Sequence, residues 1–217
     1  MPRQQPAESD PDGLSGLLAA IRACRICRDT LAKSPLPHEP RPVLRASATV
    51  RLLIAGQAPG TRVHASGVPF DDPSGDRLRD WLGLDRATFY DESRIAIVPM
   101  GFCFPGLDAK GGDLPPRREC APAWRAAVLQ AMPTVRLLLA IGAYAQRYHL
   151  GDQAAGGVTA TVAGWREIAD ATRAANGRPV FPLPHPSWRN TGWLKRNPWF
   201  DTDLLPALRR AVAESLG

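Results

Sequence analysis

Four short, largely apolar runs are spaced along the chain, and each is followed by a turn-forming segment. They are VRLLIAG (50–56), RIAIVPM (94–100), VRLLLAIG (135–142) and RPVFPLP (178–184). Stretches with helical spacing of apolar residues lie between them. Continuous apolar strands that alternate with helices are typical of a parallel sheet covered on both faces. The pattern predicts an α/β fold: a single-domain, three-layer α/β/α arrangement around a central, mostly parallel four-stranded sheet.

The N-terminal residues differ from the rest of the chain. Residues 1–13 are polar and Pro-rich, which predicts a disordered tail, and residues 14–217 form the expected domain. The segment 14–32, LSGLLAAIRACRICRDTLA, has helical spacing and precedes a Pro-rich connector. A chain of 217 residues can bury a substantial core in one domain.

The composition is that of an ordinary globular protein, with 44% hydrophobic and 22% charged residues. No apolar stretch approaches the ~20 residues that span a bilayer, and the N-terminus lacks the apolar region of a secretory signal. We therefore expect a cytoplasmic protein with no membrane partner, and a monomer.

The net charge of +6 favours a polyanionic partner such as nucleic acid. The basic residues are almost all Arg, since Lys33, Lys110 and Lys195 are the chain's lysines. Such a bias can also reflect genome composition, so a basic surface without a nucleic-acid partner is the alternative interpretation.

Ligands of parallel sheets bind beyond the carboxyl ends of the strands, which makes three loops candidates for a site. They contain GQAPG and DDPSG (56–75), GFCFPG (101–106) and HPSWRN (185–190). In the first loop, Asp71 and Asp72 could contribute chemistry or only cap a helix that begins near Ser74. In the last, His185 lies between two prolines that restrict its backbone.

The four cysteines have metal-ligand spacing. Cys24 and Cys27 form a C-x-x-C on the first predicted helix, Cys103 follows a strand, and Cys120 lies in PPRRECAPAW. Thiols of a cytosolic protein stay reduced. Four thiolates suit either a tetrahedral zinc site or an iron-sulfur cluster, and scattered structural cysteines are the alternative.

Together, GQAPG, GVPFDDPSG, the cysteine order and HPS resemble the uracil-DNA glycosylase superfamily, in particular its iron-sulfur branches. The resemblance spans residues 20–210. It implies a DNA repair glycosylase that flips uracil, or another deaminated base, out of DNA and hydrolyses its N-glycosidic bond. The partner would be DNA containing such bases. The resemblance also implies a structural 4Fe-4S cluster on Cys24, Cys27, Cys103 and Cys120, with zinc as the alternative metal.

The resemblance implies roles for individual residues as well. The loop that holds the hydrolytic water matches Gly56, Gln57, Ala58, Pro59 and Gly60. Phe70 matches the aromatic residue that stacks on the flipped base. His185 matches the histidine that contacts uracil O2, and the loop with Pro186 and Ser187 would enter the minor groove. Ser187 and Arg189 are expected to hold phosphates.

The water-activating group departs from one branch of the family, which has Glu in GEAPG where this chain has Gln57. A glutamine can position water but cannot usefully accept its proton. Another branch carries a catalytic Asp two residues before the Ser-Gly that follows the aromatic, and Asp72 matches it. We therefore expect Asp72, rather than Asp71 or Gln57, to activate water and stabilise the cationic sugar.

A second departure concerns base recognition. Relatives often place a uracil-reading Asn four or five residues before Cys103, where this chain has Val98 and Pro99. Recognition would then depend on Phe70, His185 and backbone groups around Met100 in PMGFC, unless Asn190 supplies the missing amide. We expect uracil as the main substrate, with activity on hypoxanthine or xanthine.

Two other function classes stay open. The chain could be a catalytically weak or inactive DNA-binding module of the same fold, because Gln57 replaces the acidic residue. A metal-stabilised α/β domain with an unknown ligand is the third possibility.

Overall fold

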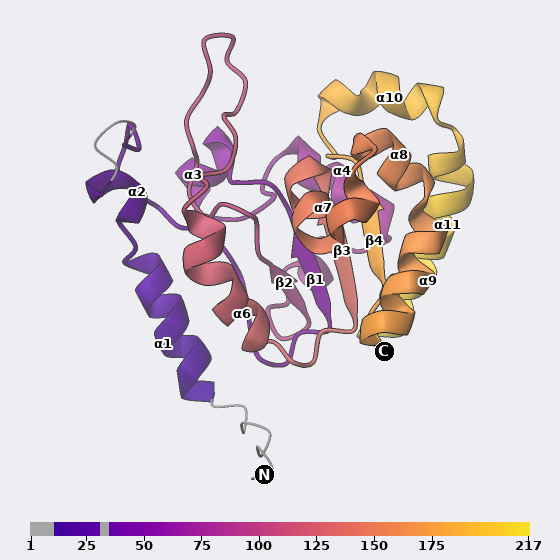
Figure 1. Ribbon diagram of the computed structural model, residues 1–217, viewed down its shortest axis with the longest axis horizontal. Coiled ribbons are helices and arrows are strands. Elements are labelled where there is room, and N and C mark those ends of the chain that lie inside the picture. Colours follow the sequence, from indigo (N-terminus) through magenta and orange to yellow (C-terminus); the bar gives the residue numbers. More distant parts are fainter. Residues whose placement is uncertain (1–10, 31–34) are drawn as a thin grey trace.

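The computed structural model describes residues 11–30 and 35–217, and it has three layers (Figure 1). The central sheet contains β1 (Leu52–Ala55), β2 (Ile95–Ile97), β3 (Leu137–Ile141) and β4 (Val180–Leu183). Its strands are all parallel, in the order β2-β1-β3-β4. The predicted fold class is confirmed, and each strand lies inside one of the four predicted apolar runs.

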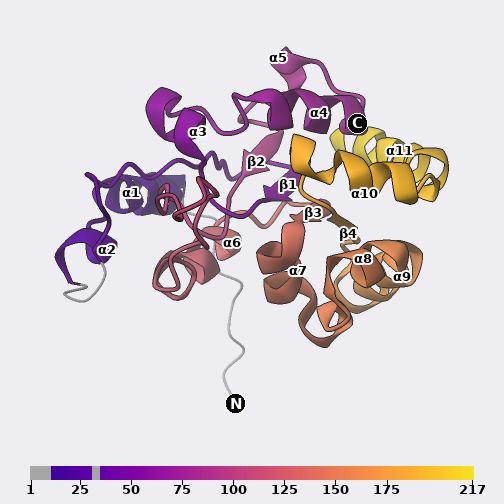
Figure 2. The ribbon, with the colours of Figure 1, turned by 90° about the horizontal axis from the view of Figure 1, so that it is seen from above.

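Helices cover both faces of the sheet, as the view from above shows (Figure 2). The helices are α1 (Pro11–Arg22), α2 (Ile26–Asp29), α3 (Thr61–Ser66), α4 (Pro73–Leu82), α5 (Arg86–Phe89), α6 (Ala126–Gln130), α7 (Gly142–Leu150), α8 (Gly157–Ala163), α9 (Trp165–Asn176), α10 (Thr191–Arg196) and α11 (Leu205–Leu216). Single turns of 3-10 or π geometry are η1 (Ala121–Arg125), η2 (Gly151–Ala154), η3 (Trp188–Asn190) and η4 (Phe200–Leu204).

The alternation of side chains along each strand divides the core into two clusters. Leu53 and Ala55 of β1 face α1, α6 and α7, whereas Leu52 and Ile54 face α4, α5 and α11. Both faces of β1 are therefore fully buried, which explains why the strand sequences are apolar without alternation.

The N-terminal region corrects two sequence predictions. Helix α1 begins at Pro11, so residues 11–13 belong to a helix rather than to the predicted tail, and residues 1–10 lie outside the described part. The predicted helix over 14–32 is also interrupted. Helix α1 ends at Arg22, Cys24 lies in the short link that follows, and Cys27 lies on the short helix α2, so the C-x-x-C is not on one helix.

The residues after β2 are anchored by a buried arginine. Arg125 has no exposed surface, and its guanidinium donates hydrogen bonds to the carbonyls of Val98 (3.0 Å) and Pro99 (2.9 Å). It also lies 2.7 Å from His149 Nε2 on α7. Burial, followed by the nearby Arg125 charge, lowers the pKa of His149 to about 3. The imidazole is therefore neutral and accepts the hydrogen bond from Arg125.

No helix of the described ranges is long and apolar enough to cross a membrane.

The lowered pKa of His149 predicts a pH dependence of stability. In the unfolded chain this group titrates near 6.5, so between pH 6.5 and about 3 the unfolded state binds a proton that the folded state does not. The contribution of neutral His149 to the free energy of unfolding is thus fully present above pH 6.5. It decreases by up to about 1.4 kcal/mol per pH unit on acidification below that pH.

Urea unfolding of the wild-type protein and His149→Gln at several pH values measures this effect. Glutamine can accept the same hydrogen bond but does not titrate. The wild type should lose stability more steeply than the variant below pH 6.5, and parallel pH dependences would contradict the assignment.

Candidate active site

A cleft of about 600 Å³ opens at the carboxyl ends of β1, β2 and β4. Three segments form its walls: the loop from β1 to α4, the long loop between β2 and η1, and the loop after β4. Clefts of this size and position are typical ligand sites of parallel α/β proteins. Most of the predicted site residues line it, namely Gly56, Gln57, Ala58, Pro59, Gly60, Phe70, Asp72, His185, Ser187 and Arg189.

Three predicted site residues do not line the cleft. Asp71 forms a 2.8 Å ion pair with Arg86. Met100 is buried in the core cluster beside α1 and α6. Asn190 donates its amide to the His185 carbonyl at 2.7 Å, so it stabilises the loop instead of presenting a free amide. The structure thus separates Asp71, which pairs with Arg86, from Asp72, which lines the cleft.

The backbone of the PMGFC segment is largely occupied by other partners. The amides of Met100 and Gly101 donate to the carbonyls of Gly56 and Gln57, each at 2.9 Å. The amide of Phe102 donates to the Cys120 sulfur at 3.3 Å, and Arg125 occupies the two carbonyls before Met100. The amides of Met100, Gly101 and Phe102 are therefore used within the fold and are not free to donate to a base, whereas each carbonyl that accepts from Arg125 keeps a second acceptor position.

Phe70 is held in a strained conformation over the first loop. It has a φ of 55°, the left-handed region that L-residues rarely adopt. Its ring atom Cζ lies 3.5 Å from the position of a Cβ on Gly56, and its edge packs on Phe89. Strained residues persist where the surroundings hold them, often at binding sites. Phe70 therefore offers a fixed, flat wall to the cleft.

Asp72 both caps a helix and lines the cleft. It is the N-cap of α4, and its Oδ1 accepts the Gly75 amide at 2.9 Å. Of the two aspartates, Asp72 is therefore the one that caps the helix. Its extended backbone and the proline that follows it, Pro73, are both favourable at a helix N-terminus. One carboxylate oxygen is used by the cap, which leaves Oδ2 for other partners.

His185 is a neutral hydrogen-bond donor. Burial lowers the pKa of its imidazole, and the charges of Asp72 and Asp113 oppose this shift. The Ser187 amide donates to Nδ1 at 3.2 Å, so the neutral tautomer compatible with this bond carries its proton on Nε2. Among the described residues Nε2 has no hydrogen-bond partner, and it can donate to a ligand in the cleft.

The loop that carries His185 is anchored from outside the cleft. Arg77 of α4 donates to the Ser187 carbonyl at 2.9 Å and to the Thr191 hydroxyl at 3.3 Å. Trp188 follows and is 74% exposed at the rim, with the Arg189 guanidinium 5.9 Å from its ring centre. Sequence reasoning gave no role to Trp188, although an exposed tryptophan beside a predicted site loop is an informative signal.

Asp113 is a cleft residue that sequence reasoning missed. It comes from the loop between β2 and η1, and its Oδ2 lies 3.4 Å from the position of a Cβ on Gly60. Partial burial raises the pKa of its carboxyl group, against the opposing effects of Arg189 and His185. The surrounding sequence, LDAKGGDLPP, has no motif or periodicity that would single this aspartate out.

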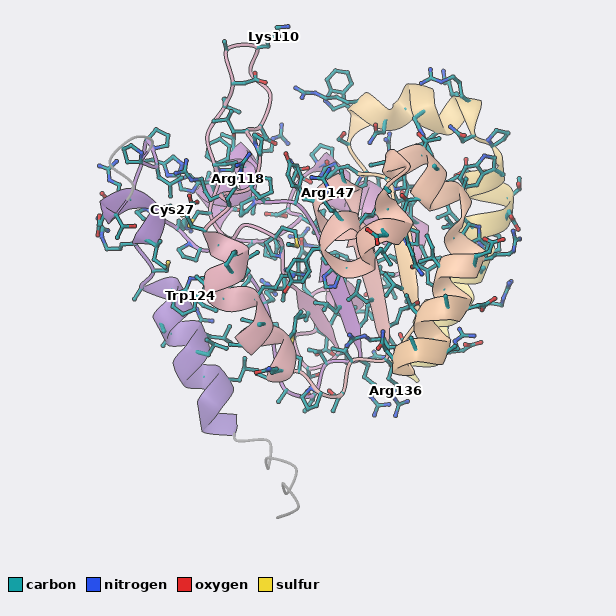
Figure 3. All side chains as sticks on the ribbon, in the orientation of Figure 1. Cys27, Lys110, Arg118, Trp124, Arg136 and Arg147 are labelled. Atoms are coloured by element: carbon teal, nitrogen blue, oxygen red, sulfur yellow. The ribbon has the colours of Figure 1, made fainter. Side chains whose placement is uncertain are left out.

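All four cysteines line one small pocket, between α2, the GFC segment after β2 and the start of η1; Figure 3 labels Cys27 at this place. Burial raises the pKa of the Cys103 thiol to about 11 and that of Cys120 to about 12. Such thiols ionise only beside a strong positive charge.

Two kinds of metal group take four thiolate ligands. No three Cys, His, Asp or Glu side chains of the described residues converge on a point that could hold one metal ion. A zinc ion needs four sulfurs within ~2.3 Å of one point. An iron-sulfur cluster is wider and takes one thiolate at each of its irons. The four thiols around one pocket supply the number of donors that either group takes.

Comparison with known proteins gives the class to which this fold and site belong. The family model of the uracil DNA glycosylase superfamily matches residues 45–209. The chain belongs to this superfamily. The match begins before β1 and extends into α11, so it includes every strand and all three walls of the cleft.

Among solved structures, the chain is similar to the solution NMR structure of a candidate uracil DNA glycosylase from Methanosarcina acetivorans. The sequence identity is 14% and the TM-score is 0.42, over 76% of this chain and 93% of that one.

The tight contact behind Phe70 predicts the effect of one substitution. A Cβ on Gly75 would lie 1.7 Å from the Phe70 carbonyl oxygen, whereas Gly16 on α1 has no neighbour within 4 Å. Gly75→Ala should therefore lower the free energy of unfolding by about 1–3 kcal/mol. Gly16→Ala should be neutral or raise it by about 0.5–1 kcal/mol. Urea denaturation compares the two, and equal effects would show that Phe70 is not held by this contact.

Proposed function

We propose that this protein is a DNA glycosylase that hydrolyses the N-glycosidic bond of uracil, and of some other deaminated bases, in DNA. The proposal depends chiefly on one observation. The cleft brings a fixed aromatic wall, a neutral histidine donor and a carboxylate together at the carboxyl edge of the sheet. Membership of the superfamily supports the same reaction.

The leaving base is stabilised by two groups. The Phe70 ring stacks on a base that has been flipped out of the duplex. Breaking the bond from C1′ to the base nitrogen puts negative charge on the base, and Nε2–H of His185 donates a hydrogen bond to its oxygen. A neutral donor suits this role because its proton stays on Nε2 throughout, while the hydrogen bond strengthens as charge develops.

Two other residues of the cleft, Asp72 and Gln57, act on the sugar and on the water. The sugar gains positive charge as the base leaves, and the negative carboxylate of Asp72 stabilises it. Gln57 lies in the same cleft and orients water through its amide. Because Oδ1 of Asp72 accepts the Gly75 amide, the carboxylate is fixed in orientation before DNA binds.

The rim of the cleft provides the contacts to DNA. Trp188 is the most exposed large apolar side chain of the described residues, and it lies in the loop that follows His185. An apolar wedge in this position fills the space that a flipped nucleotide leaves in the base stack. Arg189, beside it, contacts phosphate.

Base selectivity follows from what the pocket lacks. Val98 and Pro99 have no polar side-chain group, Asn190 is used by the loop, and most backbone groups of PMGFC are paired. A site with a dedicated polar reader rejects wrong bases by about 10⁴-fold or more. This site relies on stacking and His185, so hypoxanthine and xanthine are substrates beside uracil.

We also propose that Cys24, Cys27, Cys103 and Cys120 hold a 4Fe-4S cluster. The superfamily resemblance and their shared pocket support this. The cluster would act structurally, since it would tie α2 to the segment after β2 and to η1, and the cysteines do not line the catalytic cleft.

The catalytic assignment predicts an order among variants. In single-turnover assays on a duplex with one uracil, Asp72→Asn should slow excision about 10²-fold or more, because the charge opposite the sugar is lost. His185→Ala should also slow it strongly, and Gln57→Ala should slow it less. Alkali cleavage of the abasic product gives the rates.

The same assay separates the rival function. A wild-type protein that shifts the oligonucleotide in a gel but gives no strand breaks would be a DNA-binding module rather than a glycosylase. A larger loss in Gln57→Ala than in Asp72→Asn would show that orientation of the water by Gln57 contributes more to the rate than the charge of Asp72.

The cluster assignment predicts the colour and metal content of the protein. Protein purified without oxygen should be brown, with iron and acid-labile sulfide in equal amounts. Cys103→Ala should lose the colour and lower the unfolding temperature more than it lowers the excision rate. A colourless protein that contains zinc would contradict the assignment.

A further inference from the structure

We infer that Asp113 is a second catalytic carboxylate of the cleft, and that it accepts the proton of the attacking water. This inference rests on the proposed glycosylase reaction and extends it to a residue outside the motifs that carry the resemblance to the superfamily.

The loop that carries Asp113 has a closed base that fixes the residue's position. Leu107 and Asp113 form an antiparallel bridge, and the Leu114 amide donates to the Gly106 carbonyl at 2.9 Å. At the tip, Asp108 accepts the amides of Lys110 and Gly112, each at 2.8 Å. The loop projects from the body of the molecule, with Lys110 at its far end (Figures 1 and 3). Asp113 therefore lies at the point where this loop meets the cleft.

Its carboxylate faces the segment that holds the water. Oδ2 lies beside Gly60, the last residue of GQAPG, and both Asp113 and Gln57 line the cleft. In the described part of the chain, no group donates a hydrogen bond to this carboxylate or forms an ion pair with it. A carboxylate with open acceptor positions in a cleft is available to a water molecule.

The charges around Asp113 favour a proton acceptor. Asp72 repels its negative charge, whereas Arg189 and His185 favour it, and partial desolvation leaves its pKa raised. A general base works best when its pKa approaches the working pH. Asp72 has fewer open acceptor positions, because its Oδ1 already accepts the helix amide. The two carboxylates therefore have separate roles: Asp72 stabilises the sugar cation, and Asp113 accepts the proton of the water.

The step balances as a hydrolysis. The bond from C1′ to the base nitrogen breaks, and its electron pair leaves with the base, whose oxygen is held by His185. The water oxygen bonds to C1′, and the water proton moves to the carboxylate of Asp113. Asp113 then releases the proton to solvent, and the anionic base takes up a proton from solvent as it leaves, which gives an abasic sugar and a neutral free base.

The test compares Asp113→Asn with Asp108→Asn in single-turnover excision of uracil between pH 4.5 and 8.5. Asp108 lies in the same loop but does not line the cleft, so its variant removes an equal charge near the DNA. Asp113→Asn should excise uracil about 10²-fold or more slowly than the wild type. Its rate should also no longer fall at low pH, because the group whose protonation causes that fall, the acid limb of the pH–rate profile, has been removed. Asp108→Asn should keep both the rate and the limb.

A second variant tests the proton transfer directly. Formate should restore part of the rate of Asp113→Ala, because a small carboxylate can occupy the vacated position, and should not accelerate the wild type. If the wild type excises uracil and the rate of Asp113→Asn is within about threefold of the wild-type rate, the role of Asp113 is wrong while the proposed glycosylase function is unaffected. A slow variant with an unchanged acid limb and no formate rescue also overturns the role. A wild type without excision overturns the proposed function itself.

Discussion

The site depends on the parallel, in-register pairing of β1 with both of its neighbours. Leu53 pairs with Ala96 of β2 and with Leu138 of β3, and β4 continues the sheet in the same direction. Parallel pairing brings the carboxyl ends of the strands to one edge, so loops more than a hundred residues apart meet there. A slip of one residue would exchange the two buried faces of β1, because successive side chains point to opposite sides. The buried clusters on both sides of the sheet therefore specify the geometry of the cleft.

Around this edge, hydrogen bonds from outside the cleft hold the loops while the groups inside remain available. Arg125 anchors the residues after β2, and Asn190 and Arg77 anchor the loop after β4. By contrast, the described neighbours of His185 Nε2 and of the Asp113 carboxylate do not pair with them. A site with fixed supports and open polar positions is preorganised, so the donors and charges need little rearrangement when the substrate reacts.

The fold and much of the site could be predicted from the sequence because their signals are local. Buried parallel strands are continuous apolar runs, and the loops that follow them carry GQAPG and HPS. What depends on tertiary contacts could not be predicted. The resemblance favoured Asp72 over Asp71, but the contacts that separate them, the N-cap position of Asp72 on α4 and the ion pair of Asp71 with Arg86, come from the fold. In the sequence, Asp113 is far from any strand end and lies in a loop without periodicity. Only the fold brings it beside Gly60.

We propose that this cleft receives a base flipped out of duplex DNA. The most direct measurement is a structure of the protein bound to a duplex that contains one uridine analogue with a non-hydrolysable glycosidic bond. We expect the base to stack on Phe70 with its O2 at hydrogen-bond distance from His185 Nε2, and Trp188 to fill the space that the base has left. A duplex bound elsewhere, or one whose uracil stays within the helix while the cleft is empty of the base, would contradict it.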